Sequence, residues 1–156
     1  MEIKKILWPT DFSDNSNSAL PCVLSLSEKY GAEIHLLYVA EEIAHSGSWY
    51  GEITASQDEL QPSVFEELHQ WEVPRAERKM EEICKPELAG CPMFYKHVII
   101  GDPAQEILNT IEKQGVDVVV MATQGGKGRF HFGSVADKVV RNSSVPVWTV
   151  RPTTKK

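Results

Sequence analysis

Residues 121–134 have the sequence MATQGGKGRFHFGS, and they are the most informative segment of the chain. Three glycines and three basic side chains lie between an apolar run and the pair Gly133-Ser134, where a fourth glycine opens the pattern of a helix start. Glycine lets the backbone come close to an anion, and the free amides of a helix start attract phosphate. The segment therefore predicts a phosphate-binding loop, with a ligand-free glycine linker as the alternative.

The loop matches neither of two common nucleotide motifs. Gly126-Lys127-Gly128 lacks the spacing of a Walker A loop and the Ser or Thr that follows its Lys. A dinucleotide fingerprint would open a helix after the first strand instead.

Ser134 is predicted to cap the next helix, with Asp137 in the capping-box position. Its hydroxyl either serves that cap or donates its one proton to a phosphate oxygen. Lys127, Arg129 and His131 could add positive charge at the rim.

Strands and helices are expected to alternate along the whole chain. The nearly continuous β-branched run 116–121 is typical of a parallel strand covered on both faces. Pro146 favours an edge position for the last strand. This order predicts a single doubly wound α/β sheet. The five strands are expected at residues 5–9, 33–39, 94–100, 116–121 and 145–150.

The helices carry local start and stop signals. Ser13 or Ser18 is predicted to cap a first helix that ends at Gly31. A helix over 62–88 is expected to kink or split at Pro74, with Trp71 and Met80 on a buried stripe. Asp102 is predicted to cap a third helix, which begins at Pro103 and ends at Gly115.

Composition limits the class of protein. The 156 residues suit one domain, 1–156, and the net charge of −6 argues against a nucleic-acid partner. No signal peptide and no membrane-spanning apolar run is visible, so a cytoplasmic location without a membrane partner is expected. Cys22, Cys84 and Cys91 form no metal or redox motif, and His35 is interpreted as a sheet residue. No metal-binding residues are predicted.

Two loops are expected to share one crevice. Ligands of open parallel sheets bind beyond the carboxyl ends of the strands, where the strand order reverses. If the first and fourth strands are neighbours there, the turn Pro9-Thr10-Asp11 faces the glycine loop. Asp11 then accepts hydrogen bonds from a ribose or an adenine amino group, or else it caps the following helix. Residues 41–61 are predicted to form a long loop, either a lid or a segment packed on the surface.

Several motifs, in order, resemble the universal stress protein family over nearly the whole chain. They are KILWPTDFS (5–13), GAEIHLLYV (31–39), GDPA (101–104), VVVMATQG (118–125), GSVADKV (133–139) and VPVWTVRP (145–152). The resemblance implies the adenine nucleotide alpha hydrolase-like fold, with five parallel strands in the order 3-2-1-4-5 and helices on both faces. It also implies a stress-response protein that binds ATP or AMP, with Mg²⁺ as a companion ion. The family usually forms homodimers through its last strand, here from Val145 to Val150.

The resemblance also assigns roles to individual residues. Asp11 would meet the ribose or adenine, and the Val39 backbone would meet the adenine edge. The residues implied to line the nucleotide are Pro9, Thr10, Met121, Ala122, Gly125, Gly128, Gly133, Ser134 and Val135. The ATP-binding branch carries Gly, two residues, Gly, nine residues, then Gly and Ser or Thr. This chain has Ala122 at the first glycine and only seven residues between Gly125 and Gly133.

Two other functions fit the same motifs. One is a dimeric interaction module that keeps the fold but binds no nucleotide. The other is a slow ATPase, for which the sequence offers no convincing general base and hence no catalytic residue.

Overall fold

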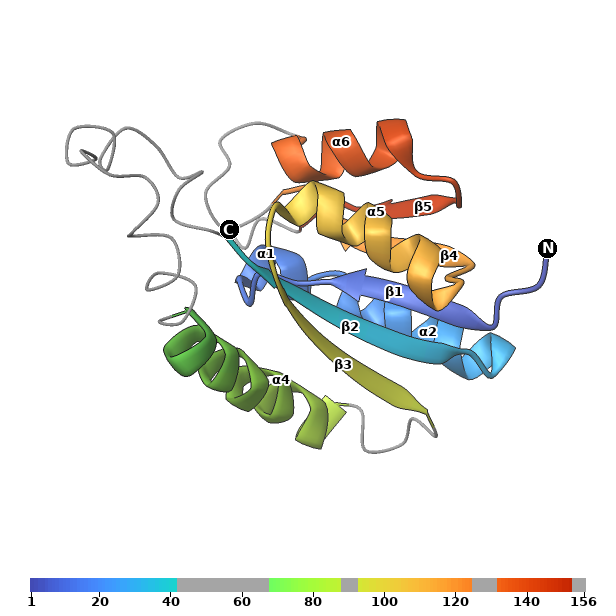
Figure 1. Cartoon of the computed structure of the whole chain (residues 1–156). Coiled ribbons are helices and arrows are strands. Elements are labelled where there is room, and N and C mark those ends of the chain that lie inside the picture. Colours follow the sequence, from blue (N-terminus) through green and yellow to red (C-terminus); the bar gives the residue numbers. More distant parts are fainter. Residues whose placement is uncertain (42–67, 88–92, 125–131, 153–156) are drawn as a thin grey trace.

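The structure, a computed structural model, describes residues 1–41, 68–87, 93–124 and 132–152. A parallel sheet of five strands lies at its centre, in the order β3-β2-β1-β4-β5 (Figure 1). The expected α/β class and the strand order 3-2-1-4-5 are confirmed. The strands are β1 Lys5–Pro9, β2 Glu33–Ala40, β3 Phe94–Ile100, β4 Val118–Ala122 and β5 Val147–Val150.

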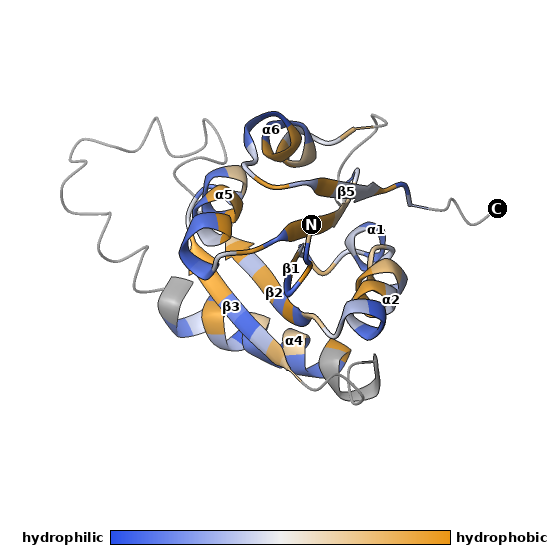
Figure 2. Cartoon of the chain, turned by 90° about the vertical axis from the view of Figure 1, so that its right-hand side faces the viewer, coloured by the Kyte–Doolittle hydropathy of each residue, from blue (hydrophilic) through white to orange (hydrophobic). Residues whose placement is uncertain are grey.

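Helices cover both faces of the sheet (Figure 2). On one face, α2 (Leu20–Tyr30) and α4 (Val73–Glu87) pack on Trp8 of β1 and its neighbours. On the other face, α5 (Pro103–Gln114) and α6 (Ser134–Asn142) pack on Leu7. Because successive strand residues point to opposite faces, Leu7 and Trp8 anchor two separate apolar clusters.

The burial of the strands follows from this arrangement. All five residues of β4 are buried, as expected for a strand with helices on both faces. β5 lies at the sheet edge, as Pro146 predicted, and it begins two residues later than expected, at Val147. No helix among the described residues has the length and apolarity needed to span a bilayer.

The cap signals are confirmed for α5 and corrected for the first helix. The Asp102 carboxylate accepts the Gln105 N–H at 3.0 Å, and Gly115 ends α5 with a positive φ of 62°. Ser13 caps only the short helix α1 (Asp14–Asn17), and Ser18 ends that helix instead of capping a longer one. The chain breaks here because Pro21 lacks an N–H and its ring would clash with the preceding turn of a continuous helix. Pro21 instead lies in the first turn of α2.

The helix predicted over 62–88 changes form next to Pro74, with residues 62–67 and 88 outside the described part of the chain, and one of its residues is not buried as predicted. A π-helix over Leu68–Glu72 gives way to α4 at Val73, one residue before Pro74. Met80 is fully buried, whereas Trp71 is 74% exposed, so the predicted stripe is wrong at Trp71. Trp71 lies in the π-helix nine residues before Met80, and at 3.6 residues per turn that spacing already places the two side chains on opposite faces of a helix.

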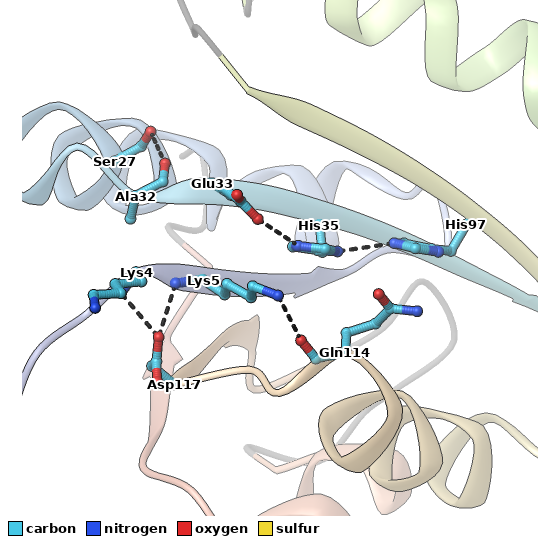
Figure 3. Close-up of polar contacts among 9 residues, drawn as sticks. All are labelled: Lys4, Lys5, Ser27, Ala32, Glu33, His35, His97, Gln114 and Asp117. Carbon is cyan, nitrogen blue, oxygen red and sulfur yellow. Dashed lines mark hydrogen bonds and ion pairs between the residues drawn. The ribbon is translucent and has the colours of Figure 1, made fainter.

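A histidine pair, buried at His35 and half-buried at His97, joins β2 to the edge strand β3 (Figure 3). His35 Nδ1 lies 2.9 Å from His97 Nε2, and His35 Nε2 lies 3.4 Å from a carboxylate oxygen of Glu33. A carboxylate only accepts, so His35 donates from Nε2 and accepts at Nδ1 from His97. The interpretation of His35 as a sheet residue is confirmed, and burial lowers the pKa of both histidines below the ordinary value of 6.5.

This pair predicts a loss of stability in mild acid. A histidine whose folded pKa is lowered stabilises the fold above its unfolded pKa, and that contribution is lost as the pH falls below about 6.5. Each histidine can add a slope of at most about 1.4 kcal/mol per pH unit. Urea unfolding followed by circular dichroism from pH 8 to pH 5 measures the effect. A variant with His35→Phe and His97→Leu should show a flatter profile, and an equally steep one would contradict this origin.

Candidate functional site

A cavity of about 1090 Å³ opens at the carboxyl ends of β1, β2 and β4. From β1 the chain continues outward to β2 and then β3, whereas β4 and β5 lie on the opposite side of β1. The strand order therefore reverses between β1 and β4, at this cavity. Nine of the eleven predicted site residues line it: Pro9, Thr10, Asp11, Val39, Met121, Ala122, Gly133, Ser134 and Val135. Gly125 and Gly128 lie outside the described residues, as do Lys127, Arg129, His131 and all of the predicted loop 41–61 except Glu41.

The turn after β1 is held by hydroxyl groups. The Thr10 N–H donates to the Leu37 carbonyl at 2.8 Å, which ties the turn to β2. Ser16 Oγ donates to the Ser13 carbonyl at 3.0 Å, so the Thr10 hydroxyl, 3.0 Å from Ser16 Oγ, is the donor between these two. Thr10 Oγ1 accepts the Phe12 N–H at 3.0 Å. Phe12 has a φ of 64°, which non-glycine residues rarely adopt, and these bonds hold it there.

Asp11 supports the same turn and does not cap the next helix. Its Oδ1 accepts the Ser13 N–H at 2.9 Å and also the Ser13 hydroxyl. Ser13 is the cap of α1, and its own Oγ accepts the Ser16 N–H at 3.2 Å. The carboxylate of Asp11 is therefore an exposed, oriented acceptor on the cavity wall.

The peptide groups of Val39 lie beyond the end of β1. The Leu37 carbonyl points toward β1, where it accepts from Thr10. Residues two apart in a strand direct their N–H and C=O to the same side. The pairing of β1 with β2 ends at Pro9 and Leu37, so Val39 directs one donor and one acceptor past the end of β1.

The start of α6 differs from the prediction by one residue. Gly133, with an extended φ of −71° and ψ of 155°, is the N-cap, so the predicted cap at Ser134 is wrong. The predicted capping box is also wrong, because Asp137 instead accepts from Arg141 Nε at 2.9 Å. Gly133 can occupy the cap position but has no side chain to cap the amides. Ser134, at the first helical position, keeps its hydroxyl out of the cap.

This start leaves backbone donors at the cavity. The first helical hydrogen bond of α6 runs from the Asp137 N–H to the Gly133 carbonyl at 2.9 Å. The N–H groups of Ser134, Val135 and Ala136 precede it and have no acceptor within the described part of the chain. All three residues line the cavity, so its wall carries three donors and the positive end of a helix dipole.

The structure accommodates Ala122, which replaces the first glycine of the family pattern, and it brings together the residues that flank the shortened loop. Ala122 is the last residue of β4 and pairs with Val150, and its backbone φ is not positive. Its methyl group therefore causes no strain. The Gly133 N–H donates to the Thr123 carbonyl at 2.5 Å, which brings the two ends of the loop together. Beside this contact the buried hydroxyl of Thr123 has no partner within the described residues.

One wall of the cavity, formed by the end of the π-helix and the start of α4, was missed by the sequence analysis. The Tyr38 hydroxyl donates to Glu72 at 2.8 Å, and burial raises the pKa of Tyr38 far above its usual value. Arg75 pairs with Glu72 at 3.3 Å, and Lys79 Nζ lies 5.3 Å from the centroid of the Phe12 ring. Glu72, Arg75 and Lys79 are spaced so that they share one helical face. A charged face of this kind is usually solvated, so the spacing alone offered no reason to place it at a site. Only the packing of α4 against β2 and β3 brings it to the cavity.

Comparison with known proteins identifies the family. The model of the universal stress protein family matches residues 2–151. Universal stress protein MJ0577 of Methanocaldococcus jannaschii is 33% identical over 154 residues, which cover 95% of this chain and 94% of that protein. The solved structure of MJ0577 superposes with a TM-score of 0.80 and 30% identity over 99% of this chain and all of the other.

Two more distant structures were solved with a nucleotide. A universal stress protein in complex with cAMP has a TM-score of 0.61 and 15% identity, over 98% of this chain and 100% of that one. An Arabidopsis thaliana protein of the family with AMP bound has a TM-score of 0.61 and 19% identity, over 97% and 93% of the two chains. At these identities the likeness shows the fold alone. With the family model matching almost every residue, the chain belongs to the universal stress protein family.

Proposed function

We propose that this protein binds an adenine nucleotide, AMP or ATP, and acts as a cytoplasmic homodimer in the response to stress. One observation carries the proposal. One cavity has, on one side, three helix N–H groups without a partner among the described residues and, on the other, the N–H and C=O of Val39 that point past the end of β1. The distribution of donors and acceptors matches a ligand with an anionic end and a hydrogen-bonding flat end.

The phosphates are expected at the start of α6. Unpartnered N–H groups and a positive dipole end favour an anion, typically by hydrogen bonds of about 1.5–3 kcal/mol to a charged group. Ser134 adds a hydroxyl that does not serve the cap. Mg²⁺ usually binds through phosphates and one or two carboxylates, and Glu41 and Asp102 line an adjoining hollow beside Ser134. When bound, the ion would neutralise phosphate charge.

The base and sugar are expected at the ends of β1 and β2. Adenine presents an amino donor beside a ring-nitrogen acceptor, which complements one C=O and one N–H of Val39. Asp11 offers a carboxylate to the ribose hydroxyls. The AMP and cAMP found on two proteins of the same fold support the choice of adenine.

Isothermal titration calorimetry with AMP and ATP tests the proposal. We expect saturable binding of one nucleotide per chain at submillimolar to millimolar concentration. GMP is the matched control, because its amino and ring-nitrogen groups are placed differently, and it should bind at least about tenfold more weakly, a difference of about 1.4 kcal/mol. An absence of heat with both AMP and ATP at millimolar concentration would favour the interaction module without a nucleotide.

The homodimer is proposed to form through β5. An edge strand offers unpaired backbone groups to a second chain, and Trp148 on β5 is 51% exposed. A Trp148→Glu variant should be a monomer at concentrations where the wild type is a dimer, because burying an unpaired charge opposes association. Light scattering after gel filtration measures this. Trp71→Glu, which alters a tryptophan that is 74% exposed elsewhere, is the control and should stay dimeric.

A further inference from the structure

Phe12 is the feature of the cavity that the proposed function leaves unexplained. It is the only described residue other than glycine with a positive φ, at 64°, and its side chain is an aromatic ring on the cavity wall. Three contacts hold that ring and its backbone. The Phe12 N–H donates to Thr10 Oγ1, the ring packs on Tyr38 with centroids 4.6 Å apart, and Lys79 Nζ lies 5.3 Å from its centroid.

A strained residue that is held this firmly at a cavity calls for a functional explanation. Rare backbone conformations persist where the surroundings impose them, and they gather at ligand sites. Here the surroundings are the hydroxyl network of Thr10, Ser13 and Ser16, which is part of the turn and not of the apolar core. The network therefore holds the Phe12 ring in position just after the carboxyl end of β1.

The backbone of Val39 determines how a flat ligand would lie. The N–H and C=O of Val39 point to the space just past the end of β1, where β1 would continue if it were longer. A base whose edge hydrogen-bonds to these two groups therefore lies in that space. Its ring then lies close to the plane of the sheet, as a neighbouring strand does. Its two flat sides consequently face the two helix layers that cover the sheet.

The two layers present different side chains to such a base. Phe12 and Tyr38 pack with the cluster under α2 and α4, whereas Ile107 and Met121 belong to the cluster under α5 and α6. All four residues line the cavity. A base in the plane of the sheet is thus bordered by an aromatic ring on one side and by aliphatic side chains on the other.

We propose that Phe12 is the stacking partner of the nucleotide base, and that its positive φ places the ring parallel to the base held by Val39. This inference rests on the proposed function, because it assumes that a nucleotide occupies the cavity. It names Phe12 as a positioning and specificity residue for flat aromatic bases. Lys79, now above the ring, would move aside or lie over the bound base, where a cation also interacts favourably with a π-system.

The test compares a ligand that has a base with one that lacks it. AMP and ribose 5-phosphate are titrated into the wild type and a Phe12→Leu variant, and the amide NMR signals of Ser134 and Val135 report binding even when it is weak. Stacking of a base on an aromatic ring is worth about 1–3 kcal/mol, so the variant should bind AMP roughly 5- to 150-fold more weakly. Its affinity for ribose 5-phosphate should stay within about twofold of the wild type.

Two further variants separate stacking from folding. Phe12→Asn removes the ring with a residue that tolerates positive φ, and it should show the same selective loss. Tyr30→Leu removes an aromatic ring that is 48% exposed on α2 and does not line the cavity, and it should change neither affinity. Circular dichroism confirms that each variant is folded.

The outcomes distinguish this inference from the proposed function. If the wild type binds AMP and the Phe12 variants bind it equally well, the stacking role is wrong and the nucleotide function stands. Equal losses for AMP and ribose 5-phosphate would also overturn it, because Phe12 would then act on the whole turn. If the wild type binds neither ligand, the proposed function is wrong and this inference is overturned with it.

Discussion

A Ser134→Asp variant is expected to lose nucleotide binding while its fold becomes slightly more stable. Ser134 is the first residue of α6 and lines the cavity beside the N–H groups that begin this helix. Two like charges about 4 Å apart near a protein surface repel by about 4 kcal/mol, and salt screening reduces this value. We therefore expect the affinity for AMP to fall by roughly 100-fold or more. The same charge at a helix start should stabilise the fold by about 0.3–1 kcal/mol.

Calorimetry and urea unfolding measure the two effects on the same protein. Asn142→Asp is the matched control, because it adds the same charge at the other end of α6, about 12 Å away along the helix axis. That distance exceeds the Debye length of about 8–10 Å, so AMP affinity should stay within about twofold. Stability should fall, because an acidic residue at a helix end opposes the dipole. Equal losses of affinity in both variants would show that net charge, and not the amide site, governs binding.

A Trp8→Ala variant is expected to lose most of the stability of the protein. Trp8 lies in the central strand β1, is fully buried, and its indole N–H donates to the Ser16 carbonyl at 3.4 Å. Truncation of a buried Trp to Ala typically costs about 3–5 kcal/mol, against a total stability of about 5–15 kcal/mol. The indole also reaches the turn that supports Thr10 and Phe12, so the cavity should lose its shape as well.

Urea unfolding followed by circular dichroism provides the measurement. Trp71→Ala makes the same change at a side chain that is 74% exposed, and it should alter the free energy of unfolding by no more than about 0.5 kcal/mol. Similar losses in the two variants would mean that Trp8 does not organise the core as its burial indicates.

Some parts of this structure followed directly from local sequence. The β-branched run of β4, the edge signal of Pro146 and the cap signals around α5 each depend on residues close together in the chain. Such signals arise from backbone sterics and hydrogen bonds within a few residues, which tertiary packing did not override. Motif order then placed the turn of Asp11 and the start of α6 at one cavity, and the structure agrees.

Other parts needed distant contacts. The cap moved from Ser134 to Gly133, whose N–H donates to the Thr123 carbonyl across the loop. The burial of Met80 and the exposure of Trp71 were decided by which face of α4 packs on the sheet.

The sequence by itself thus determined the class of fold, the strand order through a recognisable family, and the meeting of the turn after β1 with the start of α6 at the cavity. Only the tertiary structure decided that α4 supplies a third wall, that Val39 directs its peptide groups past the end of β1, and that Phe12 adopts a positive φ. The physical reason is that strands and caps depend on neighbours along the chain. The shape and donors of a cavity depend on segments that approach one another only after the sheet has formed.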